Sequence, residues 1–336
     1  MILASIVKSF CNTIDAESID ISSQSIEQVG ITLDNAIIKK DVVVLTYFDV
    51  CRIADKQLIF THRALYSRRV ILLTCGYENR KYNDLHFHLS FPIWYWERSH
   101  NNLNFAPLSK NLEYGFSCIN NRTSIDRFIL GYHLYTNGFF NRMIFTQNLT
   151  ETDYEHLEHD LYLFDVEKYY EYKRLLPIVL DEHKTLGEIN FKFFENKEGW
   201  EIPFNHPAFA NSYCFISVEA AIEEYPYTEN VNLPFCSEKS FKAFITKQIP
   251  LNVGARGHYA FIKSLGFETM DDFLPPGYDD MPYLQKVDAI VQTVAKDKDY
   301  VKDYYFANID KIKHNYELVH SKKVEQLIMQ RINDIL

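Results

Sequence analysis

The chain has 336 residues, of which 47% are hydrophobic and 24% are charged, and its formal net charge is −10. This composition is that of a globular protein and excludes a fibre or a wholly disordered chain. Lysine and arginine form no long basic run, which disfavours a protein that binds nucleic acid through the phosphate backbone. A chain of this length is expected to form two domains of roughly 100–200 residues each.

The six cysteines have no CxxC spacing; they are Cys11, Cys51, Cys75, Cys118, Cys214 and Cys236. We therefore predict no metal site and no disulfide framework, and a reducing compartment. The N-terminal run MILASIVKSF is too short for a secretory signal, and no window reaches the about 18–20 apolar residues of a membrane-spanning helix. The sequence thus predicts a soluble, cytoplasmic protein without a transmembrane segment.

Short apolar runs predict an α/β domain in residues 1–110. VVVLTYF at 42–48 and RVILLTC at 69–75 have the continuous apolar character of strands that helices cover on both faces. The alternating DLHFHL and the aromatic FPIWYW at 91–96 are two further strand candidates.

A second α/β domain is predicted for residues 111–295. Its strand candidates are GFSCIN (115–120), NRMIFT, SYCFISVE (212–219) and IPLNVG, and a helix that ends at Gly138 follows the first of them. Strands that alternate with helices predict parallel sheets, and such folds bind ligands at the carboxyl ends of the strands. The final helices, residues 296–336, are predicted to pack back on the first domain.

A short helix is predicted at 238–247, after SYCFISVE and before IPLNVG. Ser237 is a suitable N-cap, and Glu238 and Lys242 have the spacing of a surface ion pair, which explains both without a ligand. The position of the helix between two strands allows a functional interpretation as well. The first-turn amides and Lys239 can bind a diphosphate, and Glu238 can accept hydrogen bonds from a ribose diol.

SVEAAIEE, followed by CSEKSFKAFITKQIPLNVGARGHYAFIKSLGFETMDDF, resembles the donor-binding segment of glycosyltransferase family ten, the alpha-1,3-fucosyltransferases, and of related viral and bacterial glycosyltransferases. The order of the elements matches, and the matching positions are Glu219, Ser237-Glu238-Lys239-Ser240-Phe241-Lys242, Pro250, Gly254 with Gly257, and Asp271-Asp272-Phe273. Asp271-Asp272 and Asp279-Asp280 are interpreted as loop and cap residues, and no DxD metal motif stands at a predicted strand end.

A second patch, FSCINNRTSIDRFILGYHLYTNG, resembles the opening of the same donor domain. Arg122 and Arg127 occupy its arginine positions, and both could reach one diphosphate. An ion pair between Arg127 and Asp126 is the alternative explanation for the second arginine.

The resemblance implies a GT-B-like fold of two facing Rossmann-like domains with parallel sheets and C-terminal helices. It also implies inverting, metal-independent transfer from a nucleotide-diphosphate sugar, such as a GDP-sugar, to a hydroxyl acceptor such as a glycan, without a further cofactor. In this scheme Glu219 supports the sugar or ribose, and the loop at Gly254 lies in the donor site. Glu97 and Asp49, each at the end of a predicted strand, are alternative general bases, and each is also explained as a solvated turn residue.

Two other classes of function stay open. A non-catalytic nucleotide-sugar or glycan-binding protein would keep the fold and lack the base. A structural or assembly protein would use the tyrosine-rich middle of the chain for contacts and would have no small-molecule site beside Lys239.

Overall fold

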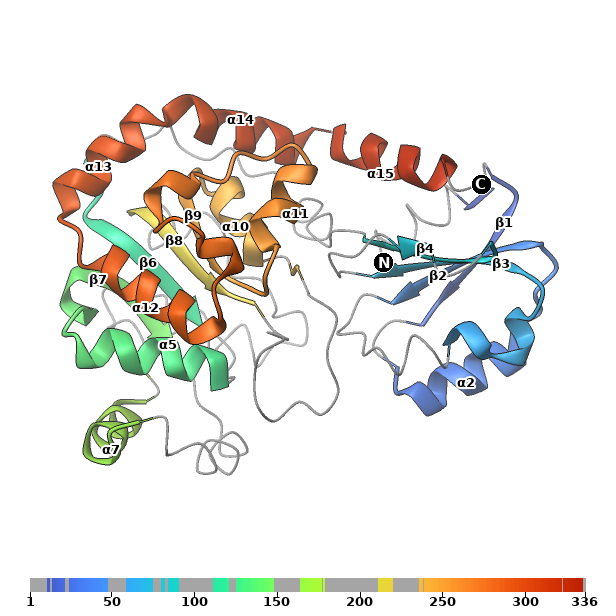
Figure 1. The fold of residues 1–336 in the computed structure, drawn as a ribbon, viewed down its shortest axis with the longest axis horizontal. Helices are drawn as coiled ribbons and strands as arrows, with labels where there is room; N and C mark the ends of the chain where they lie inside the picture. Colours follow the sequence, from blue (N-terminus) through green and yellow to red (C-terminus); the bar gives the residue numbers. More distant parts are fainter. Residues whose placement is uncertain are drawn as a thin grey trace.

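The computed structural model describes residues 11–12, 14–21, 24–47, 59–74, 80–81, 84–90, 111–120, 125–147, 164–176, 178, 211–219, 236–237, 239–321 and 323–334. They form two β-sheets that lie at opposite ends of the long axis of the molecule (Figure 1). The strands are mostly parallel and alternate with helices, so the predicted α/β class with parallel sheets is confirmed. No helix in the described part of the chain is both long enough and apolar enough to cross a membrane.

The first sheet has the order β1-β2-β3-β5-β4. Its strands are β1 (Ala16–Asp20), β2 (Val42–Tyr47), β3 (Arg69–Thr74), β4 (Arg80–Lys81) and β5 (His86–Ser90). All pairs are parallel except the one between β4 and β5. The strands predicted at 42–48, at 69–75 and in DLHFHL are confirmed, and the one at 91–96 lies outside the described residues.

Helix α2 (Ile26–Asn35) connects β1 to β2, and sequence analysis predicts neither β1 nor α2. The helix begins with a capping box in which Ser25 and Gln28 each accept a hydrogen bond from the other residue's backbone amide. Val29 and Leu33 are buried and belong to the hydrophobic core of the first sheet.

The second sheet has the order β7-β6-β8-β9, and all of its strands are parallel. They are β6 (Tyr114–Asn120), β7 (Met143–Gln147), β8 (Ser212–Val218) and β9 (Ile249–Val253). All four strands predicted for this part of the chain are confirmed. β6 and β8 form the middle of the sheet and are buried along most of their length, as strands between two helical layers are.

Helices cover both faces of the second sheet (Figure 1). On one face α5 (Ile125–Thr136) and α12 (Tyr283–Val294) pack on each other and on the sheet. On the other face α10 (Lys239–Ile245) packs on β8 and β9, and its Ala243 joins a small apolar cluster with Ile144 and Phe215. Phe241, Phe244 and Ile245 of α10 are also buried.

Gly131 lies in the middle of α5, where a larger residue would collide with its neighbours. A Cβ atom at this position would clash with the hydroxyl of Tyr172 and with the amide oxygen of Gln147. These two groups are hydrogen-bonded to each other at 2.7 Å. The glycine therefore permits the close approach of α7 (Val166–Leu175), the helix that carries Tyr172.

The last helices are α13 (Lys298–Ala307), α14 (Ile309–His320) and α15 (Lys323–Asn333). α13 packs on β6 and β8, and α14 packs on α10, so the described contacts of both are with the second sheet. α15 extends from α14 toward the first sheet in Figure 1. Packing of residues 296–336 across the first domain stays a prediction.

Candidate functional site

The strand order of the second sheet reverses between β6 and β8. From β6 the chain enters β7 on one side, and the later strands β8 and β9 lie on the other side. The pairing of β6 with β8 ends at Cys118 and Ile216, two residues before either strand ends. A reversal of this kind opens a crevice at the carboxyl edge of a parallel sheet, where such folds bind ligands. Asn120 ends β6 here, and Glu219 follows β8.

Glu219 is 1% exposed, and its carboxylate is hydrogen-bonded inside the protein. Oε2 accepts a hydrogen bond from the backbone amide of Ser237 at 3.1 Å, and Oε1 accepts one from the hydroxyl of Ser240. Both donors lie at the start of α10. Glu219 therefore fixes the start of this helix to the end of β8. Both of its carboxylate oxygens bind groups of the protein, whereas sequence analysis expects the side chain to support a sugar or ribose.

The start of α10 places Ser237 and Lys239 together, as the motif predicts. Ser237 is buried, and its hydroxyl oxygen accepts a hydrogen bond from the Lys239 amide at 3.2 Å. The Lys239 ammonium lies 3.3 Å from the same oxygen. Lys239 and Lys242 are both half-buried. Lys239 thus brings a positive charge to the carboxyl edge of the sheet, next to the residue that Glu219 holds.

Ser240 also connects Glu219 to His258, the first residue of α11 (His258–Ser264). Its hydroxyl oxygen lies 3.1 Å from Nε2 of His258. Burial, together with a smaller effect of the Lys286 charge, lowers the pKa of the His258 imidazole to about 3. The imidazole is therefore neutral at physiological pH.

Cys236, directly before the capping serine, is also buried, and its sulfur lies within 4.8 Å of ligand atoms of Glu219 and His258.

The loop after β9 is held by a lysine from α12. Lys286 is 1% exposed, and its ammonium donates hydrogen bonds to the carbonyl oxygens of Gly254 and Ala255 at 3.0 and 3.1 Å. Gly257, the N-cap of α11, has φ = 76°, a left-handed conformation that glycine adopts without strain. Gly254 thus lies in the predicted glycine-bearing loop, with its carbonyl group bound by the protein.

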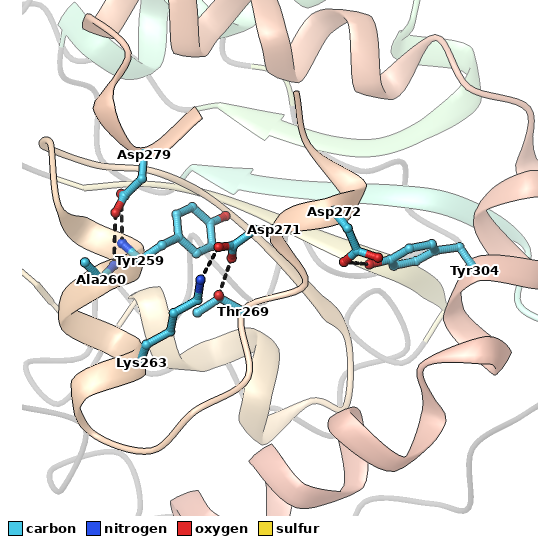
Figure 2. Close-up of polar contacts among 8 residues, drawn as sticks. All are labelled: Tyr259, Ala260, Lys263, Thr269, Asp271, Asp272, Asp279 and Tyr304. Carbon is cyan, nitrogen blue, oxygen red and sulfur yellow. Dashed lines mark hydrogen bonds and ion pairs between the residues drawn. The ribbon is translucent and has the colours of Figure 1, made fainter. Parts of the chain in front are cut away.

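The carboxylates after α11 are also used within the protein, and Figure 2 shows their partners. Asp279 accepts hydrogen bonds from the backbone amides of Tyr259 and Ala260, both at 2.9 Å, and so caps the first turn of α11. Asp272 accepts a hydrogen bond from the hydroxyl of Tyr304 at 2.6 Å.

Asp271, the neighbour of Asp272, is bound to Lys263 and to the hydroxyl of Thr269 (Figure 2). These contacts agree with the interpretation of the aspartates as loop and cap residues.

Arg127 lies in the first turn of α5, the helix that follows β6 in the chain, and is 5% exposed. Burial raises the pKa of the neighbouring Asp126 carboxyl to about 7, and Arg127 opposes this shift. Burial also raises the pKa of the Cys118 thiol on β6, to about 12, against the effects of the Asn120 side chain and Arg127. The positive charge of Arg127 therefore acts on both the Asp126 carboxyl and the Cys118 thiol of β6, and an ion pair with Asp126 stays a prediction.

Four predicted site residues lie outside the described residues: Arg122, Glu238, Asp49 and Glu97. The structure places Glu219, Ser237 and Lys239 together and puts Arg127 beside β6. Sequence analysis missed Cys236, Ser240, His258 and Lys286 as parts of this site. His258 could have been predicted, because it begins the helix that follows the glycine-bearing loop.

Comparisons of the chain with models of known protein families, with curated proteins and with solved structures find no match.

Proposed function

We propose that the chain binds a nucleotide-diphosphate sugar at the carboxyl ends of β6 and β8 and transfers the sugar to a hydroxyl acceptor. The main support is that the residues predicted for the donor site lie where the fold predicts a ligand site. The strand order reverses between β6 and β8, and Arg127, Glu219 and Lys239, which the family resemblance assigns to the donor site, come from the segments that follow these two strands.

The diphosphate would lie between the start of α5 and the start of α10. As the bond from the sugar C1 to the diphosphate breaks, negative charge grows on the leaving group, and the cations of Arg127 and Lys239 offset it. Arg122 and Glu238 belong to the same proposal, as a second cation for the diphosphate and as the acceptor for the ribose hydroxyls. Glu219 acts as a positioning residue, because its carboxylate holds the start of α10.

The acceptor hydroxyl attacks C1 from the face opposite the diphosphate, so the configuration at C1 inverts. Its proton passes to a carboxylate of the first domain, for which Asp49 and Glu97 are the two candidates. The GDP-sugar identity of the donor and the GT-B arrangement of the two domains belong to this proposal as well.

Nucleotide binding is the first test. A thermal-shift screen of the full chain against GDP, UDP, CMP and their sugar conjugates should identify one base, and a ligand at about 100 times its Kd adds about 2.7 kcal/mol to the free energy of unfolding. Lys239→Ala removes a charged contact worth about 1.5–3 kcal/mol, and Arg127→Lys removes the paired hydrogen bonds that a guanidinium group gives to a diphosphate, so each should weaken binding of that nucleotide by about tenfold or more. Stabilisation by none of these nucleotides would overturn the proposal.

The control is Lys313→Ala, which removes a lysine of α14 that pairs with Asp310 on the protein surface. This variant should bind as the unaltered chain does. Transfer is tested separately, by mass spectrometry of acceptor and donor products with Asp49→Asn and Glu97→Gln. Nucleotide binding without transfer or donor hydrolysis would favour the non-catalytic binding protein.

A further inference from the structure

Glu219, Cys236 and His258 bring a carboxylate, a thiol and an imidazole together in the interior. Their ligand atoms lie within 4.8 Å of one another, and none of the three residues is more than 1% exposed. They lie at two connections at one end of the second sheet: Glu219 begins the one between β8 and α10, Cys236 lies near its end, and His258 directly follows the one between β9 and α11. The long separations between them in the sequence explain why cysteine spacing gives no sign of the cluster.

We propose that these three residues form a closed zinc site. Zinc binds sulfur at about 2.3 Å and nitrogen or oxygen at about 2.0–2.2 Å, so the ligand atoms of a tetrahedral site are about 3.3–3.8 Å apart. The separations in the cluster exceed this range by about 1–1.5 Å at most, which rotation of the side chains can remove. Full burial is also typical of structural zinc sites, which are closed to solvent.

The mixture of ligand atoms decides which metal fits. A thiolate is a poor ligand for Mg²⁺ or Ca²⁺ and a good one for zinc, and imidazole nitrogen suits zinc as well. Zinc displaces the thiol proton of Cys236, which passes to the solvent as the zinc–sulfur bond forms. The thiolate and the Glu219 carboxylate then offset the two positive charges of the metal.

Ser240 provides the fourth position. Its hydroxyl donates a hydrogen bond to Glu219, and its oxygen lies 3.1 Å from Nε2 of His258, so this oxygen stands between two of the three ligands. From there it can coordinate the metal directly. The same hydrogen bonds explain the positions of Glu219 and His258 without a metal. The test that separates the two explanations is therefore made at the cysteine ligand, whose thiolate gives a metal complex a signature of its own.

A metal at this place would join the end of β8, the approach to α10 and the start of α11. The connection between β8 and α10 and the one between β9 and α11 would then be fixed to each other at the sheet edge. The site would be structural, and it does not depend on nucleotide binding or on sugar transfer.

Metal content of the purified full chain, prepared without chelators, is the direct test. We expect about one zinc per chain in the unaltered protein and less than about a tenth of that in Cys236→Ser and His258→Gln. Cys214→Ser is the matched control, because Cys214 is another buried cysteine of this domain and should leave the zinc in place. Zinc that persists in Cys236→Ser would overturn the proposal, as would a chain that contains none.

Cobalt titration provides a readout that does not require the variants to fold well. The unaltered chain, stripped of metal, should develop a thiolate-to-cobalt charge-transfer band together with the visible bands of tetrahedral cobalt. Ser240→Ala removes both the proposed fourth ligand and the hydrogen bonds that orient Glu219 and His258, so the apparent affinity for cobalt should fall by at least about 10–100-fold, the usual effect of losing the orienting bonds alone. Absence of the thiolate band at saturating cobalt would contradict the proposal whatever the variants do.

Discussion

Both sheets are mainly parallel, and they differ in what they bury at the carboxyl ends of their strands. At the end of β1, Asp20 is exposed and accepts a hydrogen bond from Thr46 at 2.9 Å. At the end of β8, Glu219 is 1% exposed and accepts its hydrogen bonds from the start of a helix. Among the described residues, the buried ionisable side chains other than cysteine and tyrosine all lie around the second sheet; they are Asp126, Arg127, Glu219, His258 and Lys286.

This difference shows that the burial of charged side chains, which is unfavourable for folding, is concentrated around the second sheet. Taking a charged group out of water is unfavourable unless other groups replace its hydrogen bonds, and clusters of such groups are typical of functional sites. At the end of β1, in the first sheet, the Asp20 carboxylate keeps access to water. The second sheet therefore carries the groups of the proposed donor site and of the proposed zinc site.

The largest effect is expected from removal of the buried carboxylate. Glu219→Ala leaves the amide of Ser237 and the hydroxyl of Ser240 buried without this acceptor, at about 1–3 kcal/mol for each donor, so the free energy of unfolding should fall by about 2–6 kcal/mol. Asp20→Ala, the matched change at the end of β1, should lower it by about 0.5–1.5 kcal/mol, because water can replace an exposed acceptor. Urea denaturation monitored by circular dichroism measures both variants. Equal losses in the free energy of unfolding would show that the two sheets do not differ in this respect.

A pH-dependent effect of up to about 4 kcal/mol is expected at Asp126. Burial raises its pKa in the folded chain from 3.8 to about 7. Between these two values the folded chain binds more protons than the unfolded chain, so the free energy of unfolding falls as the pH rises through this window. Asp126→Asn should abolish that fall and should be more stable than the unaltered chain above neutral pH.

Denaturation midpoints from about pH 5 to pH 8 measure this effect. The control is Asp41→Asn, which removes a solvent-exposed carboxylate beside the first sheet and should keep the fall in stability that Asp126 causes. A profile for Asp126→Asn that parallels the unaltered chain would show that Arg127 keeps Asp126 charged throughout the range.

The smallest effects are expected at the surface, where the two sheets should behave alike. Lys263→Ala removes the ion pair with Asp271, and Arg63→Ala removes the one with Asp34 at 2.8 Å. Exposed pairs contribute about 0.2–1 kcal/mol, and both losses should be reduced further by salt. Denaturation at low and high ionic strength measures both variants, and a loss well above this range at either position would show that the pair does more than bridge two surface side chains.

The sequence predicts much of the fold because the central strands are short, apolar and rich in β-branched residues. β2 and β3 are recognised for this reason, and α5 is recognised by its apolar spacing and by the glycine that ends it. β1 escapes prediction because AESID is half polar and lies at the edge of its sheet. α7 is missed because its sequence is polar and only Tyr169 and Tyr172 are buried.

The site could be predicted only where its residues are close in sequence. Ser237 and Lys239 stand in one motif and do lie together. The role of Glu219 depends on a helix start many residues later, and Lys286 looks like an ordinary surface position of an amphipathic helix until the fold places it beside the loop after β9. Contacts between residues so far apart in the sequence leave no local pattern that could predict them.

The hydrogen bonds of Lys286 have a consequence for the polarity of that loop. A trans peptide group is planar, and its N–H points opposite to its C=O. Because the carbonyl groups of Gly254 and Ala255 both turn toward the lysine, the amide hydrogens of Ala255 and Arg256 must turn away from it. One buried ammonium on α12 thus orients two consecutive peptide dipoles and gives the loop a negative side that faces the interior and a positive side opposite.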